Sequence, residues 1–238
     1  MSGARRLRIL ADLAGRAEGE LGAMVLCEVC RTVTGATGAA IMLMSGDLPL
    51  GSVCTTGEVS SLIEDLQYTF GEGPCVDAYD LDRPVLEPDL ADPATPRWPA
   101  FTGAAVAAGV RAVFGFPMAV GSVRLGALNL YTDHPGPLTD DQHADALVMA
   151  GVAAEAVLAM QAGSPPGALA AELEGSDFRY VVHQAAGMVS AQLDVSVTVA
   201  MVRLRGYAFG NERRLDDVAA DVVARRLRLS ASPAEAGG

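Results

Sequence analysis

Apolar and polar positions along the first two thirds of the chain follow helical spacing in some segments and strand spacing in others. Over 5–33 the apolar residues recur partly at helical spacing, although glycines weaken the middle of this predicted helix. The segments that follow are shorter, with strands predicted at 38–44, 50–55 and 84–87 and helices at 57–68, 75–79 and 98–108.

The two clearest strands, 110–120 and 123–131, are separated only by Gly121 and Ser122, a pair typical of a type II′ hairpin. Tight hairpins of this kind join antiparallel strands, whereas parallel strands need long crossovers. The sequence therefore predicts an α+β fold, in which an antiparallel sheet carries helices on its faces.

A longer helix is predicted over 139–161. Thr139 at its N-cap and Gln142 three residues later have the spacing of a capping box. The run Gly163-Ser-Pro-Pro-Gly167 ends the helix and begins a linker. We therefore expect one domain over 1–162, a linker over 163–176, a second domain over 177–230 and a disordered tail over 231–238.

Three helical patterns follow one another in the second domain, each with one apolar stripe. The stripes comprise Phe178, Val181, Val182, Ala185, Met188 and Val189; then Val197, Ala200, Met201, Leu204 and Ala208; then Leu215, Val218, Ala219, Val222, Val223 and Leu227. Helices this short are stable in water only when such stripes are buried against one another or a partner. The sequence therefore predicts a small all-α bundle, a size that favours dimerisation.

Charge is distributed unevenly along the chain, whose formal net charge is −12. All 17 basic residues are arginine; eight lie within 177–229, beside six acids, while the other nine share the rest of the chain with 23 acids. An acidic body repels a polyanion, so a nucleic-acid site is expected only in the mildly basic second domain.

Half of the residues are apolar, but charge, Gly or Pro interrupts each long apolar run before the roughly 18 residues that a membrane span needs. The N-terminal segment also lacks the apolar core of a signal peptide. We therefore expect a cytoplasmic protein without a membrane segment.

The four cysteines do not have the density of a disulfide framework. Cys27 and Cys30 have the spacing of a redox pair or half a zinc site, but no second pair completes a metal shell. Buried, reduced thiols are therefore expected, and neither a metal site nor a cofactor is predicted.

The second domain resembles the ANTAR family, whose members bind paired hairpins in nascent RNA and prevent transcription termination. The resemblance covers about 50 residues and rests on the following segments in register: His183-Gln-Ala-Ala-Gly-Met188, Ala200, Leu204-Arg205, Ala208, Asn211, Arg213-Arg214-Leu215 and Val218-Ala219. Where the family commonly has lysine, this chain has Ala186.

The first domain resembles the GAF domains found ahead of ANTAR modules, chiefly in actinobacteria. The matching stretches include Gly71-Glu-Gly-Pro-Cys75, Pro88-Asp-Leu-Ala-Asp-Pro93, Arg97-Trp98-Pro99, Gly109-Val-Arg-Ala-Val-Phe114 and Leu125-Gly-Ala-Leu-Asn-Leu-Tyr131. The resemblance implies a sensory fold that binds small molecules or mediates dimerisation, without naming the ligand.

Two candidate sites follow. RNA is read by aromatic and arginine planes and by cationic contacts to phosphate, which points to Arg205, Tyr207, Asn211, Arg213 and Arg214. A pocket for the unknown small-molecule ligand is expected to be lined by Gly71, Gly73, Cys75, Phe114 and Phe116. The combined expectation is a homodimeric, signal-responsive antitermination regulator rather than an enzyme.

Two alternatives remain open. Some GAF proteins reduce free methionine sulfoxide through thiolates, a role that Cys54 and Cys75 would fill here. Three helices can also form a DNA-binding transcription factor, but Asp216 and Asp217 would then enter the major groove at the start of the third helix.

Overall fold

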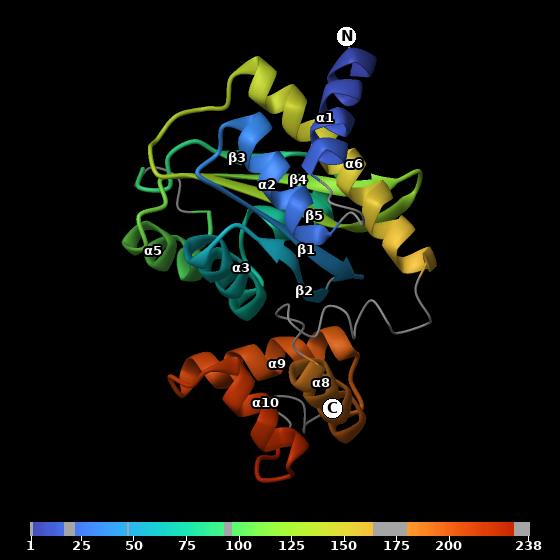
Figure 1. Ribbon diagram of the computed structural model, residues 1–238. Coiled ribbons are helices and arrows are strands. Elements are labelled where there is room, and N and C mark those ends of the chain that lie inside the picture. Colours follow the sequence, from blue (N-terminus) through green and yellow to red (C-terminus); the bar gives the residue numbers. More distant parts are fainter. Residues whose placement is uncertain (1, 17–21, 47, 93–96, 164–179, 231–238) are drawn as a thin grey trace. The chain divides into compact units, whose positions relative to one another are not determined.

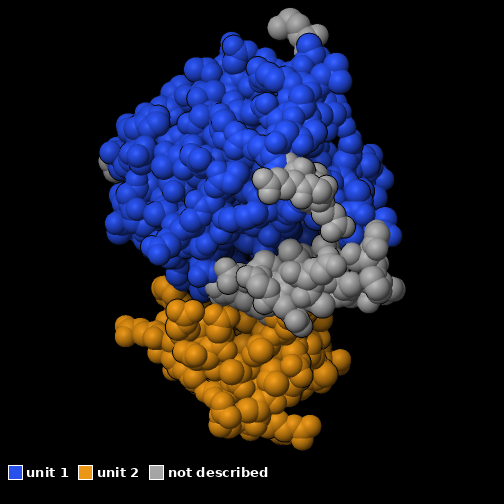
Figure 2. All heavy atoms as spheres, viewed as in Figure 1, with its two compact units in different colours: residues 1–178 blue, residues 179–238 orange. Residues whose placement is uncertain are grey.

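The computed structural model describes residues 2–16, 22–46, 48–92, 97–163 and 180–230. The chain forms two compact units, Met1–Phe178 and Arg179–Gly238 (Figure 2). The elements of the first unit are α1 (Ser2–Arg16), α2 (Ala23–Thr34), β1 (Gly38–Ser45), β2 (Leu48–Thr55), α3 (Glu58–Phe70), α4 (Pro74–Leu81), β3 (Val85–Glu87), α5 (Pro99–Ala107), β4 (Ala112–Val120), β5 (Val123–Thr132) and α6 (Asp140–Gly163).

The five strands form one antiparallel sheet in the order β2-β1-β5-β4-β3, which confirms the α+β fold expected for this domain. Helices α1, α2 and α6 cover one face, and α3, α4 and α5 lie on the other (Figure 1). Gly121 has a φ of 61°, as the first central position of a type II′ turn requires. The α6 capping box also forms, because Thr139 Oγ1 accepts from the Gln142 amide while Gln142 Oε1 accepts from the Thr139 amide.

The prediction of one helix over 5–33 is wrong, because the structure has α1 and α2 as separate helices. Gly22 precedes α2 in an extended conformation, with φ −73° and ψ 149°, and therefore ends any continuous helix. Glycine favours such a break because it loses more conformational freedom than other residues when it becomes helical. The helical spacing survives on both sides because α1 and α2 each pack on α6.

A hydrophobic core cluster lies between the sheet and the helices α1, α2 and α6. Met149, Ala153 and Val157 of α6 are fully buried in it. Over Asp140–Ala162 this helix is long and apolar enough to cross a membrane, which the interrupted apolar runs did not lead us to expect. The helix packs against β4, and a helix buried in the core of a protein is also apolar over most of its length. Its composition is therefore explained by burial in the core as well.

The second unit contains α8 (Tyr180–Leu193), α9 (Val197–Gly210) and α10 (Leu215–Val223). Each helix buries one stripe against the other two, as Val182, Met201 and Val218 illustrate. Ser196 caps α9 by accepting a hydrogen bond from the Val199 amide. The proposed linker over 163–176 and the tail over 231–238 lie outside the described residues, apart from Gly163 at the end of α6.

Candidate functional site

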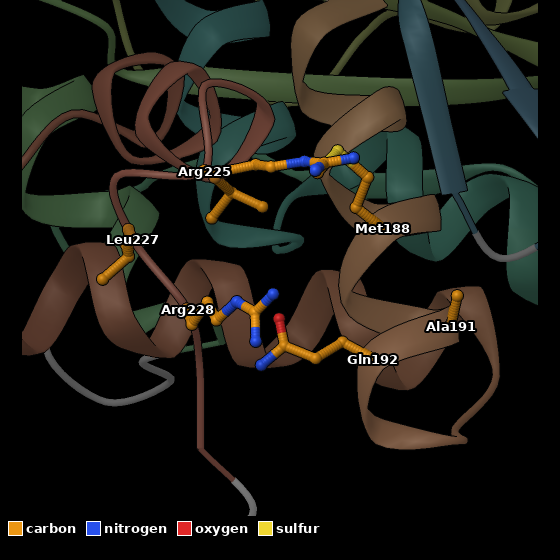
Figure 3. A pocket seen from close by; sticks show the side chains of 7 residues that line it. Met188, Ala191, Gln192, Arg225, Leu227 and Arg228 are labelled. Atoms are coloured by element: carbon orange, nitrogen blue, oxygen red, sulfur yellow. The ribbon is translucent and has the colours of Figure 1, made fainter.

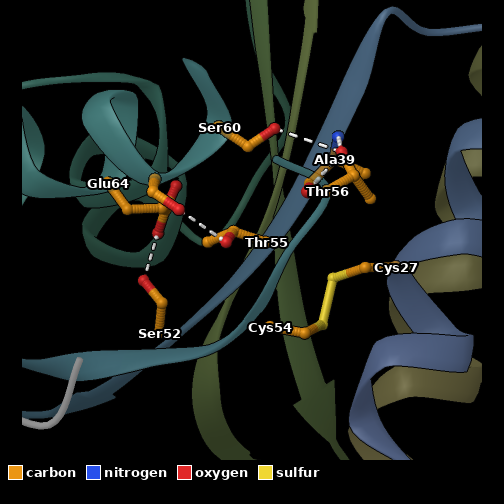
Figure 4. The surroundings of a disulfide bond; sticks show 9 residues. Cys27, Ala39, Ser52, Cys54, Thr55, Thr56, Ser60 and Glu64 are labelled. Atoms are coloured by element: carbon orange, nitrogen blue, oxygen red, sulfur yellow. Dashed lines mark hydrogen bonds between the residues drawn. A yellow bond between two sulfur atoms is a disulfide. The ribbon is translucent and has the colours of Figure 1, made fainter. Parts of the chain in front are cut away.

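The cysteines differ from the expectation of four reduced thiols. Cys27 of α2 forms a disulfide with Cys54 of β2 and so links a helix to the sheet it covers (Figure 4). Cys30 and Cys75 are free and fully buried, and burial raises the pKa of each thiol. The Cys27-x-x-Cys30 spacing was misleading because Cys30 packs in the core one helical turn from Cys27, while the strand supplies the bonding partner.

A cluster of buried polar side chains lies on the opposite face of the sheet, beneath α3 and α4. At its centre is the carboxyl group of Glu64, which is only 3% exposed. Its oxygens accept hydrogen bonds from Ser52 Oγ at 3.1 Å, Asn129 Nδ2 at 2.8 Å and Gln67 Nε2 at 3.2 Å. We call Ser52, Glu64, Gln67, Cys75 and Asn129 the Glu64 cluster.

The electrostatics of this cluster are unusual for a carboxyl group. Burial raises the pKa of Glu64 from its ordinary value of 4.5 to about 7, although the hydrogen bonds from Asn129, Ser52 and Gln67 oppose the change. Among the described residues no basic side chain pairs with Glu64. The site therefore changes charge near neutral pH.

Asn129 contributes a polar atom that the hydrogen bonds of the cluster do not use. Its Oδ1 is buried and accepts no hydrogen bond from the described part of the chain. A buried acceptor without a donor is costly, and such groups usually meet an ordered water or a ligand. A protonated Glu64 and this oxygen together provide one donor and one acceptor for a small polar molecule.

The glycine-rich loop between α3 and α4 is fastened to the same cluster. Gly73 has a φ of 134°, and a Cβ placed on it would lie 2.5 Å from Gln67 Oε1. That oxygen accepts a hydrogen bond from the Cys75 amide at 2.8 Å, and Gly71 ends α3 in the left-handed conformation. Only glycine at 73 combines this φ with this approach to Gln67.

The five residues predicted to line a ligand pocket are divided between the two faces of the sheet. Cys75 belongs to the Glu64 cluster and Gly73 contacts it, whereas Phe114 and Phe116 point into the core beneath α6. The ring of Phe116 contacts that of His143 on α6, with centroids 5.3 Å apart. The five therefore do not surround one common space, because successive side chains of a strand alternate between faces and the two phenylalanines share the face opposite α4.

Sequence reasoning missed Glu64, Gln67 and Asn129, although a signal was present. On α3 the buried positions include Ile63, Glu64, Gln67 and Tyr68, which form one helical stripe containing an acid and an amide. Asn129 lies between the buried Leu128 and Leu130 of β5. Polar residues at core positions are uncommon. Several of them on neighbouring elements therefore indicate a candidate functional site.

The residues predicted to contact RNA lie around the turn between α9 and α10. Arg205 and Tyr207 belong to α9, and Asn211, Arg213 and Arg214 lie in the turn. The Asn211 side chain donates to the Tyr207 carbonyl at 2.8 Å. The structure thus brings these five residues into one region of the bundle.

The arginines of this turn also have partners within the chain. Arg213 pairs with Asp221 of α10 at 2.6 Å, and Arg214 pairs with Asp216 at 3.4 Å. Arg213 and Arg226 hold the pKa of Asp221 below its ordinary range. A phosphate that binds at Arg213 must therefore compete with a carboxylate already in place.

Ala186, at the position where the ANTAR family commonly has lysine, is fully buried in the bundle.

The described residues contain no group of three or more His, Cys, Asp and Glu side chains that could hold a metal ion.

Comparison with known proteins identifies the fold of the first unit. Residues 15–159 match the family model of the GAF domain. The GAF domain of a phosphoenolpyruvate-protein phosphotransferase from Coxiella burnetii is 14% identical, with 68% of this chain and 98% of that chain covered and a TM-score of 0.50. Free methionine-R-sulfoxide reductase from Neisseria meningitidis, solved with its substrate, is 14% identical over 68% and 93% of the two chains, with a TM-score of 0.49.

The GAF domain of a phosphoenolpyruvate-protein phosphotransferase from Acinetobacter is 10% identical over 68% and 96% of the two chains, with a TM-score of 0.46. No curated protein matches the sequence. Identities this low bear on the fold alone, because one fold hosts many functions.

Proposed function

Because the chain belongs to the GAF domain family, we propose that it is a signal-responsive regulator whose GAF sensor controls RNA binding by the C-terminal three-helix unit. In this proposal the second unit is an ANTAR module that binds paired hairpins in nascent RNA and prevents transcription termination. The protein acts in the cytoplasm, where nascent RNA is made, and a signal at the sensor changes the relative stability of two arrangements of the chain.

The proposal rests on the basic and polar residues around the turn between α9 and α10. The turn gathers two exposed arginines, Arg213 and Arg214, and an exposed Asn211, beside the half-buried Tyr207 of α9. Arginine forks suit phosphate oxygens and base edges, and an aromatic ring can stack on an unpaired base. Asn211, Arg213 and Arg214 occupy positions that match the ANTAR motif. They lie in the part of the chain where basic residues outnumber acids.

The Glu64 cluster is the proposed contact of the sensor with its ligand. Its polar groups are buried, one acceptor lacks a donor among the described residues, and its charge changes near neutral pH. A small polar molecule with both a donor and an acceptor matches these groups. Native mass spectrometry of the purified chain should then detect a retained small molecule that Asn129→Leu no longer holds; an unchanged mass for both proteins would count against this contact.

No catalytic role is proposed. Cys54 is bonded to Cys27, and the pKa of the buried Cys75 thiol is raised, first by burial and then by Glu64. Both features oppose formation of the thiolate that methionine sulfoxide reduction needs. Turnover of free methionine sulfoxide that Cys75→Ser abolishes would contradict this proposal.

Dimerisation is proposed through α1 and α6. A groove of about 400 Å³ runs between these helices, with Leu10, Val152 and Ala156 in its lining. Leu7 on α1 is 70% exposed, and α6 carries apolar residues on all sides rather than on one stripe. A second copy would cover this face by packing the same helices against it.

The dimer can be tested by sedimentation equilibrium of the full chain. We expect wild-type protein to sediment as a dimer and the Leu7→Glu/Leu10→Glu variant as a monomer, because two charges would be buried at the interface. Leu81→Glu is the matched control, since Leu81 is an exposed leucine on α4. A monomeric wild-type protein at micromolar concentration would contradict the proposal.

RNA binding can be tested with the full chain and two labelled ligands of equal length, an RNA with two adjacent hairpins and a DNA duplex. We expect the RNA to bind more tightly at moderate salt, with an affinity that falls steeply as salt rises. Arg213→Ala or Arg214→Ala should weaken RNA binding by about tenfold, while Arg83→Ala, an exposed arginine of the sensor, should not. Equal affinity for both ligands would remove the antitermination proposal.

A further inference from the structure

A second arginine-lined feature of the three-helix unit lies away from the α9–α10 turn. It is a groove of about 430 Å³ between α8 and the segment 224–230 that follows α10. Met188, Ala191 and Gln192 of α8 line one side of it. Figure 3 shows the side chain of Arg225 reaching toward Met188 and that of Arg228 reaching toward Gln192.

The backbone turns sharply after α10, and this turn directs the segment that carries both arginines along α8. Arg225 has a φ of 59°, in the left-handed region that non-glycine residues rarely adopt, and its amide donates to the Val222 carbonyl. The following amide, that of Arg226, donates to the Asp221 carbonyl and so tightens the turn. Together these two amide hydrogen bonds form the usual left-handed cap at the end of a helix. Gln192 Nε2 donates to the carbonyl of Leu229 and fastens the segment to α8.

Arg225 and Arg228 give the groove a positive charge. Arg213, Arg214 and Arg226 each pair with an aspartate. Among the described residues Arg225 and Arg228 form no ion pair, and no acid lines the groove. The remaining lining is apolar or neutral, with Val222 and Leu227 beside the residues of α8. The two guanidinium groups can bind the anionic oxygens of a ligand, while the apolar lining can contact a flat apolar part of the same molecule.

We propose that this groove binds the RNA backbone, with Arg225 and Arg228 contacting phosphate oxygens and the apolar lining contacting ribose or base. The inference rests on the proposed function, because it concerns where the same RNA is held. RNA is favoured over an acidic protein segment because every nucleotide carries both a charged phosphate and a flat ring. Binding at this groove also avoids the competition that Asp221 imposes at Arg213.

The test compares the full-length wild-type chain with an Arg225→Ala/Arg228→Ala variant, using the two-hairpin RNA in an anisotropy titration at several salt concentrations. We expect the variant to bind at least tenfold more weakly and the slope of log K against log salt to be smaller by about 2, one for each lost phosphate contact. Arg16→Ala/Arg83→Ala is the control with the same loss of charge and should retain wild-type affinity, because both arginines are exposed residues of the first unit.

A second variant separates lost contacts from lost structure. Arg225→Lys/Arg228→Lys keeps both charges, so the salt slope should stay near that of the wild-type chain while the affinity falls by less than in the alanine variant. Thermal unfolding monitored by circular dichroism should give the same midpoint for the lysine variant and the wild type.

Three results would overturn the inference, and they are distinguishable. If wild-type protein binds RNA and both groove variants bind it equally well, the groove is not an RNA contact and the proposed function survives. If wild-type protein prefers an acidic peptide to RNA and Arg225→Ala/Arg228→Ala abolishes that preference, the groove holds a protein segment. If wild-type protein binds the hairpin RNA no better than duplex DNA, the proposed function fails together with the inference.

Discussion

Replacing Glu64 by glutamine is expected to raise the free energy of unfolding at pH 8 by about 3 kcal/mol and to leave it nearly unchanged at pH 4. Burial raises the pKa of Glu64 from 4.5 to about 7, and each pKa unit corresponds to roughly 1.4 kcal/mol. The favourable contribution of the protonated group is complete below pH 4.5, is lost as pH rises toward 7 and stays lost above it. Glutamine is neutral throughout and can keep the hydrogen bonds to Ser52 and Asn129.

Urea denaturation of both proteins across pH 4–8 would measure this difference. Glu58→Gln is the matched control, because Glu58 is exposed in the first turn of the same helix. Its loss should change stability by less than about 1 kcal/mol, without a change of slope between pH 4.5 and 7. A Glu64→Gln variant that is less stable than wild type at pH 8 would mean that Glu64 is held as a stabilising anion.

Reduction of the disulfide is expected to lower the free energy of unfolding by about 3–4 kcal/mol. Cys27 and Cys54 are 27 residues apart, and the entropy of closing a loop of this length gives that magnitude. The bond also holds α2 against β2, so reduction should loosen the part of the core built on α2. Because both sulfur-bearing residues are buried, the bond should react with dithiothreitol slowly.

The measurement is a denaturation curve with and without dithiothreitol, for wild-type protein and for Cys27→Ala/Cys54→Ala. Wild-type protein should lose stability on reduction and approach the double variant, which should not respond to the reductant. Cys30→Ala, which keeps the disulfide, should still respond. Equal curves for oxidised and reduced wild-type protein would show that the pairing contributes nothing to stability.

The sequence predicted those parts of the fold that depend on local signals. The Gly121-Ser122 turn and the Thr139–Gln142 capping box are each set by residues a few positions apart, and both appear as expected. The predicted strands lie within a few residues of those in the structure, because turn residues mark where most of them begin and end. The extent of a helix is less local, and the break at Gly22 was hidden because the apolar spacing continues on both sides of it.

The Glu64 cluster and the disulfide could not be derived in this way, because each joins elements distant in the sequence. Glu64 meets Asn129 across 65 positions, and Cys54 meets Cys27 only because α2 packs on β2. Phe114 and Cys75 were grouped by chemistry, but strand alternation places them on opposite faces of the sheet. The position of Arg225 and Arg228 beside α8 likewise depends on the left-handed turn after α10, which the spacing of apolar residues does not reveal.

Proposed RNA binding by the second unit can be measured in cells by recovering the RNA that crosslinks to the full-length protein. We expect enrichment of transcript segments that can form two adjacent hairpins close to a terminator, and much lower recovery with the Arg225→Ala/Arg228→Ala variant expressed at the same level. Recovery of no more RNA with the wild-type protein than from an uncrosslinked sample, or recovery of duplex DNA instead, would contradict RNA binding by this protein.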